Sequence, residues 1–171
     1  MRVTSIKYNE PGVSKFLMAL AENFAQDNFV YVKEFKKHLK LGPKDSVDVI
    51  VLLEDDKKIT HLYDGLNYKL GFNAKVPTFF RGKDGKSLMF PGGFNILFVN
   101  INQFRALHHR WHIIAAVVEK DLISIIRGRI IDGYKESMLL VLDHNSYFNE
   151  DKEVIELFAA KPAKKDLREY L

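Results

Sequence analysis

The apolar residues of this chain are gathered in short runs, and turn-forming residues separate one run from the next. Segments 94–101 (FNILFVNI) and 137–143 (SMLLVLD) are rich in aliphatic, β-branched and aromatic side chains, which favour strands. The dipeptides Asp64–Gly65 and Asp84–Gly85 are typical of two-residue hairpin turns. Because tight turns join antiparallel neighbours, we predict an α+β fold in which the strands are mostly antiparallel.

Three hairpins follow from this pattern. The first covers 57–72 and the second covers 76–90, each with an Asp-Gly turn near its centre. The third joins 122–131 to 137–143 through the polar segment DGYKE, and we predict that its two apolar strands are buried.

Helices are predicted where apolar residues recur at intervals of three and four. This spacing indicates an N-terminal amphipathic helix over 13–24, a shorter helix over 32–40 and a central helix over 104–120. Two short helices, 150–160 and 163–170, are predicted to close the chain.

Segment 46–53 (SVDVIVLL) fits two structures. Its many β-branched residues favour a strand, although the spacing of Val47, Ile50 and Val51 also fits a helix. If this segment were helical, the N-terminal half would have the order of elements of a winged helix, a likeness of layout alone.

The length of the chain fits one domain. We expect a single compact α+β domain over 1–171, with a possible division into a helical, wing-like part over 1–75 and an α+β part over 76–171.

The sequence has no cysteine, which excludes disulfides, a thiolate nucleophile and cysteine-ligated zinc. We find no signal-peptide pattern, and the apolar runs are too short to cross a bilayer. We therefore expect a cytoplasmic protein without a membrane partner.

Several chemical motifs have little support in the sequence. His108 and His112 would be neighbours on the predicted helix 104–120 and could share a metal ion, but no carboxylate lies between them. Segment 81–87 ends in Gly-Lys-Ser, yet the first glycine of a phosphate-binding loop is replaced by Phe80. No dinucleotide-binding pattern occurs, so we expect no cofactor.

The acidic segments on either side of 46–53 are the best candidates for catalysis. Asp45 precedes it, and Asp55 with Lys57 follows it, an order that loosely resembles that of metal-dependent nucleases. A solvated turn explains the same residues, so these three are weak candidates.

Positive charge gives the clearest functional indication. Four lysines share one side of the predicted helix 32–40, where their mutual repulsion favours a nearby anion: Lys33, Lys36, Lys37 and Lys40. A second basic group lies in the predicted hairpins and is interleaved with aromatic residues that could stack on unpaired bases. Its basic members are Lys57, Lys58, Lys69, Lys75, Arg81, Lys83 and Lys86, and its aromatic members are Tyr63, Tyr68, Phe72, Phe79 and Phe80. Arg127 and Arg129 form a third group, on one face of a predicted strand.

Three functions remain open at this point. The first is non-catalytic binding of nucleic acid, or of a complex that contains it, through a lysine-rich face. The second is a metal-dependent nuclease or hydrolase. The third is a subunit of a larger assembly, for example a viral one, with a protein partner or a second copy of the chain.

Overall fold

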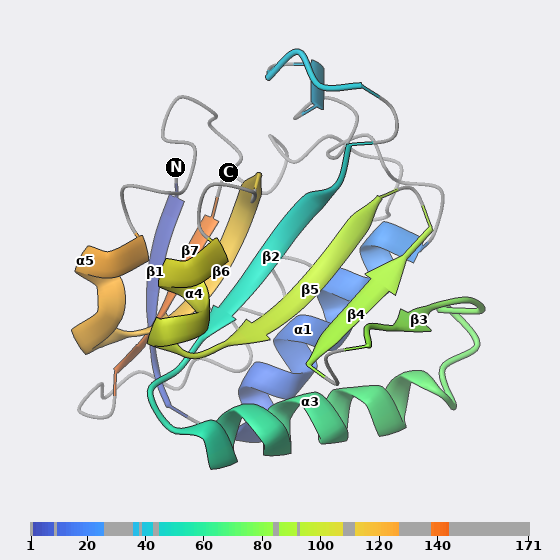
Figure 1. Cartoon of the computed structure of the whole chain (residues 1–171). Helices are drawn as coiled ribbons and strands as arrows, with labels where there is room; N and C mark the ends of the chain where they lie inside the picture. Colours follow the sequence, from blue (N-terminus) through green and yellow to red (C-terminus); the bar gives the residue numbers. More distant parts are fainter. Residues whose placement is uncertain are drawn as a thin grey trace.

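A computed structural model shows a seven-stranded mixed sheet with helices on both faces (Figure 1). The strands lie in the order β1-β7-β6-β2-β5-β4-β3. The structure describes residues 2–8, 10–25, 36–37, 39–42, 45–83, 86–91, 93–107, 112–126 and 138–143. Its strands are β1 (Arg2–Lys7), β2 (Val47–Leu52), β3 (Phe80–Arg81), β4 (Ser87–Phe90), β5 (Phe94–Val99), β6 (Ile113–Glu119) and β7 (Met138–Asp143). Its helical elements are α1 (Glu10–Ala25), α3 (Asp56–Leu70), α4 (Ile101–Leu107), η2 (Lys120–Leu122) and α5 (Ile123–Ile126).

The prediction of a mostly antiparallel α+β fold is wrong, because the fold is α/β. Strands β1, β7, β6, β2 and β5 are all parallel to their neighbours in this series, and only the pairs β5–β4 and β4–β3 are antiparallel. The central strands are buried on both faces: all six residues of β2 are buried, and so are residues 113–118 of β6. Parallel strands covered by helices on both sides have such continuous apolar sequences. The winged-helix layout is also wrong, since the segment contains strand β2, Val47–Leu52, and no helix.

The predicted hairpin at 57–72 is helix α3. Its buried residues recur with helical spacing: Ile59, Leu62, Tyr63, Leu66 and Leu70. Asp55 caps the helix by accepting a hydrogen bond from the backbone N–H of Lys57 at 2.8 Å. Gly65 is within the helix, where a Cβ atom would lie 4.0 Å from Oγ of Ser14 on α1. The glycine thus lies where the two helices approach each other, and it makes no turn.

The predicted central helix 104–120 is also wrong. The helix α4 covers only Ile101–Leu107, and the run Ile113–Val118 is strand β6. The third predicted hairpin fails as well, because residues 120–126 are helical and β7 pairs in parallel with β1 and β6. Three predictions are confirmed: the hairpin at 76–90 is β3–β4, the strand at 94–101 is β5, and the helix at 13–24 is α1.

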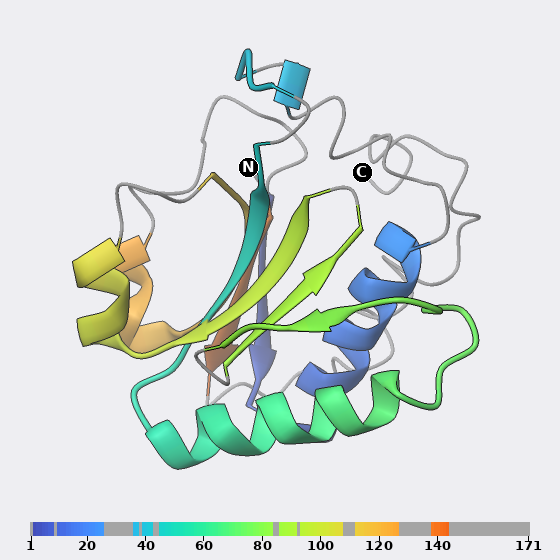
Figure 2. The ribbon, with the colours of Figure 1, turned by 45° about the vertical axis from the view of Figure 1, so that its right-hand side comes forward.

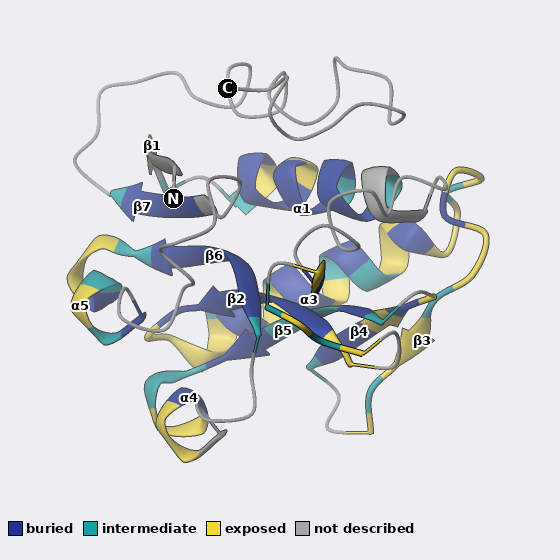
Figure 3. Cartoon of the chain, turned by 90° about the horizontal axis from the view of Figure 1, so that it is seen from above, coloured by how far each residue is buried: buried dark blue, intermediate teal, exposed yellow. Residues whose placement is uncertain are grey.

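The sheet divides the core into two layers, one on each of its faces. Helices α1 and α3 cover one face of the sheet, while α4, η2 and α5 pack on the other (Figure 2). Phe104 anchors α4 against Ile50, Leu52 and Ile113 of the second layer. Figure 3 shows the resulting contrast between buried β2 and β6 and the exposed edge strand β3. Within the described part, no helix is long and apolar enough to cross a membrane.

Candidate nucleic-acid interface

Exposed aromatic and basic side chains gather where α3 ends and the chain passes to β3. Tyr68 is 71% exposed and Phe72 is 79% exposed, and their ring centroids lie 5.1 Å apart. Between residues 67 and 83 the sequence has four basic residues and no acidic residue. We call this region the basic–aromatic surface, and define it as Tyr68, Lys69, Phe72, Lys75, Arg81 and Lys83.

The loop that carries Phe72 and Lys75 is anchored at both ends. Asn73 donates a hydrogen bond from Nδ2 to Oε1 of Glu22 on α1 at 2.7 Å, and its Oδ1 accepts one from the backbone N–H of Lys75 at 2.9 Å. Val76 is 2% exposed and belongs to the core. These anchors fix the backbone of the loop, so its exposed side chains are held in solvent. Binding a ligand there therefore costs little further backbone entropy.

Arg81 connects β3 to the end of α3. Its Nε donates a hydrogen bond to Oδ1 of Asn67 at 2.7 Å, and its guanidinium lies 5.6 Å from the centroid of the Phe79 ring. These contacts hold the guanidinium between Asn67 of α3 and the ring of Phe79. Phe80, which is 59% exposed, points to the opposite face of the sheet because consecutive strand residues alternate.

The predicted lysine stripe is only partly exposed. Lys36 is 8% exposed, and its Nζ would lie 3.0 Å from a Cβ atom added to Gly93, at the amino ends of β2 and β5. Lys37 and Lys40 are exposed, and Lys40 has a positive φ of 56°, which is outside the helical region. Lys36 therefore does not share an exposed face with the other two. Lys33, Arg127 and Arg129 lie outside the described residues.

Lys57 and Lys58 lie at the opposite end of α3 from the basic–aromatic surface, about 18 Å from Lys69 at 1.5 Å per residue. Lys58 places its Nζ 4.7 Å from the centroid of the Tyr8 ring. Burial, and then the nearby carboxylates of Glu10, Glu119 and Asp55, raise the pKa of Tyr8 to about 12. This end of α3 is therefore acidic in character, and the structure separates these two lysines from Arg81 and Lys83.

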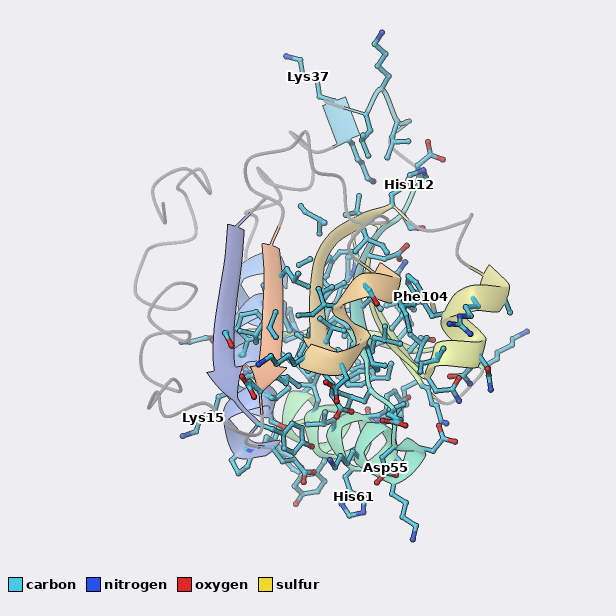
Figure 4. The ribbon with its side chains drawn as sticks, turned by 90° about the vertical axis from the view of Figure 1, so that its left-hand side faces the viewer. Lys15, Lys37, Asp55, His61, Phe104 and His112 are labelled. Carbon is cyan, nitrogen blue, oxygen red and sulfur yellow. The ribbon has the colours of Figure 1, made fainter. Side chains whose placement is uncertain are left out.

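The structure also separates the candidate nuclease residues. Asp45 precedes β2 and Asp55 follows it, so a six-residue strand of about 20 Å lies between them. Each carboxylate has a local structural contact: Asp45 accepts from the backbone N–H of Gly42, and Asp55 caps α3. Figure 4 shows Asp55 at the end of the sheet away from Lys37.

Of the two candidate metal residues, His112 is among the described residues. His112 is followed directly by β6, and its Nδ1 lies 3.3 Å from the backbone oxygen of Ser46. His108 lies outside the described residues. In the part of the chain that the structure describes, no three His, Cys, Asp or Glu side chains are grouped so that they could hold a metal ion.

Sequence reasoning missed a polar pair on the sheet face that α1 and α3 do not cover. Asp48 of β2 is 3% exposed, and its Oδ1 accepts a hydrogen bond from Nδ2 of Asn95 on β5 at 3.0 Å. Burial raises the pKa of Asp48, while the hydrogen bonds from Asn95 and from the backbone of His112 lower it in part. The sequence shows Asp48 in an apolar run, but only the parallel pairing of β2 with β5 reveals its partner.

A scan against protein-family models and a search of curated proteins each found no match to this sequence. The function is therefore argued from the arrangement of the residues described above.

Proposed function

We propose that this chain is an intracellular protein that binds single-stranded nucleic acid, without catalysis, through the basic–aromatic surface. The observation that carries the proposal is the strong exposure of Tyr68 and Phe72 in a stretch that has four cations and no acid. Large aromatic side chains usually contribute to a core, and exposed rings beside cations are typical of surfaces on which unpaired bases stack.

The two kinds of side chain have different roles in this proposal. Lys69, Lys75, Arg81 and Lys83 neutralise backbone phosphates, an interaction that releases counterions and carries little sequence information. Tyr68 and Phe72 stack on bases, which favours single strands because the bases of a duplex are already stacked. Catalysis through Asp45, Asp55 and Lys57 has no geometric support, since the structure separates the two carboxylates.

Fluorescence anisotropy with labelled single-stranded DNA and RNA tests the proposal. We expect Phe72→Ala to weaken binding about 5- to 150-fold, since stacking contributes roughly 1–3 kcal/mol per base. A Lys69→Gln/Lys75→Gln variant should weaken binding and lower the slope of log K against log salt concentration by about 1.4, or 0.7 for each phosphate that the variant no longer neutralises.

Lys15→Gln is the matched control, because Lys15 is exposed on α1 and lies outside the basic–aromatic surface. Binding that is absent, that does not depend on salt, or that is lowered equally by Lys15→Gln would overturn the proposal. Sedimentation of the unbound protein addresses the assembly-subunit alternative, which predicts a stable oligomer without nucleic acid.

A further inference from the structure

Three residues form a row across the edge of the sheet, on the face that α1 and α3 do not cover. Phe80 of β3 is paired with Met89 of β4, and Met89 is paired with Asn95 of β5. The residues that alternate with them along β4 and β5, including Leu88 and Ile96, are in the core against α1 and α3. Phe80, Met89 and Asn95 therefore point the other way, and we call them the open row.

The described helices leave this part of the face uncovered. The core layer under α4, η2 and α5 is built on β2, β6 and β7; from β5 it takes only Leu97 and Val99, and among the described residues it takes nothing from β3 or β4. Met89 is accordingly 39% exposed in the middle of a strand, and Phe80 is 59% exposed. Figure 1 shows α4 and α5 toward the β1–β7–β6 side of the sheet.

Asn95 lies at the inner end of the open row, and its side-chain amide has a fixed orientation. An ionised carboxylate can only accept hydrogen bonds, so the amide nitrogen of Asn95 must face Asp48, as the 3.0 Å contact shows. That nitrogen carries two N–H groups, and Asp48 accepts from one of them. The second N–H group and the amide oxygen are the donor and acceptor pair with which asparagine binds the N7 and N6 positions of adenine.

The surrounding charge favours an anionic ligand. Lys83 follows Phe80 closely along the chain, and Lys37 and Lys40 are exposed in the segment that precedes β2. Asp48, which lies beyond Asn95 on β2, is buried and bonded to Asn95. Strands lie about 4.8 Å apart, so a base that covers Met89 and Phe80 has its edge within reach of Asn95.

We propose that the open row is an adenine subsite of the nucleic-acid interface, an inference that rests on the function proposed above. The base lies on the Phe80 and Met89 side chains, while Asn95 donates to N7 and accepts from the N6 amino group. Phosphates on either side of this nucleotide contact the flanking cations. The basic–aromatic surface binds without regard to sequence, and the open row adds a preference for one base.

Competition between oligonucleotides tests this subsite on the native protein. The probes are oligo-uridine and the same strand with one central adenosine, 7-deazaadenosine or inosine. We expect the adenosine strand to bind about 5- to 150-fold more tightly than oligo-uridine, following the 1–3 kcal/mol of a bidentate contact. Replacing N7 or the N6 amino group should remove most of this preference.

Two variants extend the test. Phe80→Ala changes an exposed side chain, so we expect it to fold normally and to bind the adenosine strand and oligo-uridine almost equally. Asn95→Ser, checked for folding by circular dichroism, should no longer distinguish adenosine from inosine. Uniform binding of all four strands to the native protein would overturn the adenine subsite and leave the proposed function intact. If no strand binds, both proposals fail.

Discussion

The buried residue Asp48 allows a direct test of how a buried carboxyl group affects the free energy of unfolding of this protein. Asp48 is 3% exposed, and burial raises the pKa of its carboxyl group above the ordinary value of 3.8. Ionisation therefore costs more free energy in the folded chain than in the unfolded chain. We predict that Asp48→Asn stabilises the protein at pH 7, because asparagine is neutral, has the same shape and still offers Oδ1 to the amide of Asn95.

The sign of the pH dependence follows from proton binding. As the pH rises above 3.8, the unfolded chain loses the Asp48 proton while the folded chain still holds it, because its pKa is raised. The folded chain then binds more protons than the unfolded chain, so this residue lowers stability progressively until its folded pKa is passed. Above that pH the cost is complete, and it is about 1.4 kcal/mol for each unit by which burial raises the pKa.

Urea unfolding followed by far-ultraviolet circular dichroism at pH 4, 5, 6, 7 and 8 measures the effect. The stability of Asp48→Asn relative to native protein should increase from pH 4 upward and become constant once the folded pKa of Asp48 is passed, with an unchanged urea dependence. For a chain of this size, each 1 kcal/mol corresponds to a shift of roughly 2–4 °C in the melting temperature. Asp64→Asn, at an exposed position of α3, is the control and should show no such trend. An Asp48→Asn variant that is less stable at pH 7 would show that ionised Asp48 is stabilised by more than its contacts with Asn95 and His112.

Substitutions at three further positions test the fold. Phe104→Ala should lower the free energy of unfolding, measured in urea, by about 3–5 kcal/mol, because it removes the 1% exposed ring that packs α4 on the sheet. A decrease of less than about 1 kcal/mol would contradict this packing. Gly93→Ala should cost about 1–3 kcal/mol, because the φ of Gly93 is 78° and a Cβ atom would lie 3.2 Å from the backbone oxygen of Asp45; equal melting temperatures would refute the strain. Asp55→Ala should lower the free energy of unfolding by about 1 kcal/mol, because α3 would have no side-chain cap. Asp55→Asn, which can still cap the helix, should keep most of the native stability. Two equally destabilised variants would indicate a charge effect instead.

Local periodicity predicts some elements correctly. The α1 helix follows from the helical spacing of its apolar residues, and β5 follows from a dense run of apolar side chains next to turn-forming residues. For α3 the same helical spacing is present in the sequence, but the Asp64–Gly65 pair predicts a turn within it. In the structure Gly65 lies between two packed helices, a role that depends on Ser14, about fifty residues earlier.

The parallel topology could not be obtained from these local patterns. Segment 113–118 continues the spacing of the apolar residues before it, so it resembles the end of a helix, yet it is buried on both faces as a central strand. Parallel neighbours in this sheet are far apart in sequence: β1 pairs with β7, and β2 pairs with both β5 and β6. No turn dipeptide marks such pairings, because each one requires a crossover connection.

The alternation of side chains along β3 explains why the sequence predicts one half of the proposed interface and misses the other. Phe80 and Arg81 are consecutive, so the sequence places both in one basic and aromatic group. In the sheet they point to opposite faces: Arg81 binds Asn67 on α3, and Phe80 is paired with Met89 on the open face. A strand of nucleic acid that contacts both surfaces must therefore pass around β3, which has only two residues and is the edge of the sheet. In the proposed interface, this short edge strand gives a single strand of nucleic acid access to both the basic–aromatic surface and the open row.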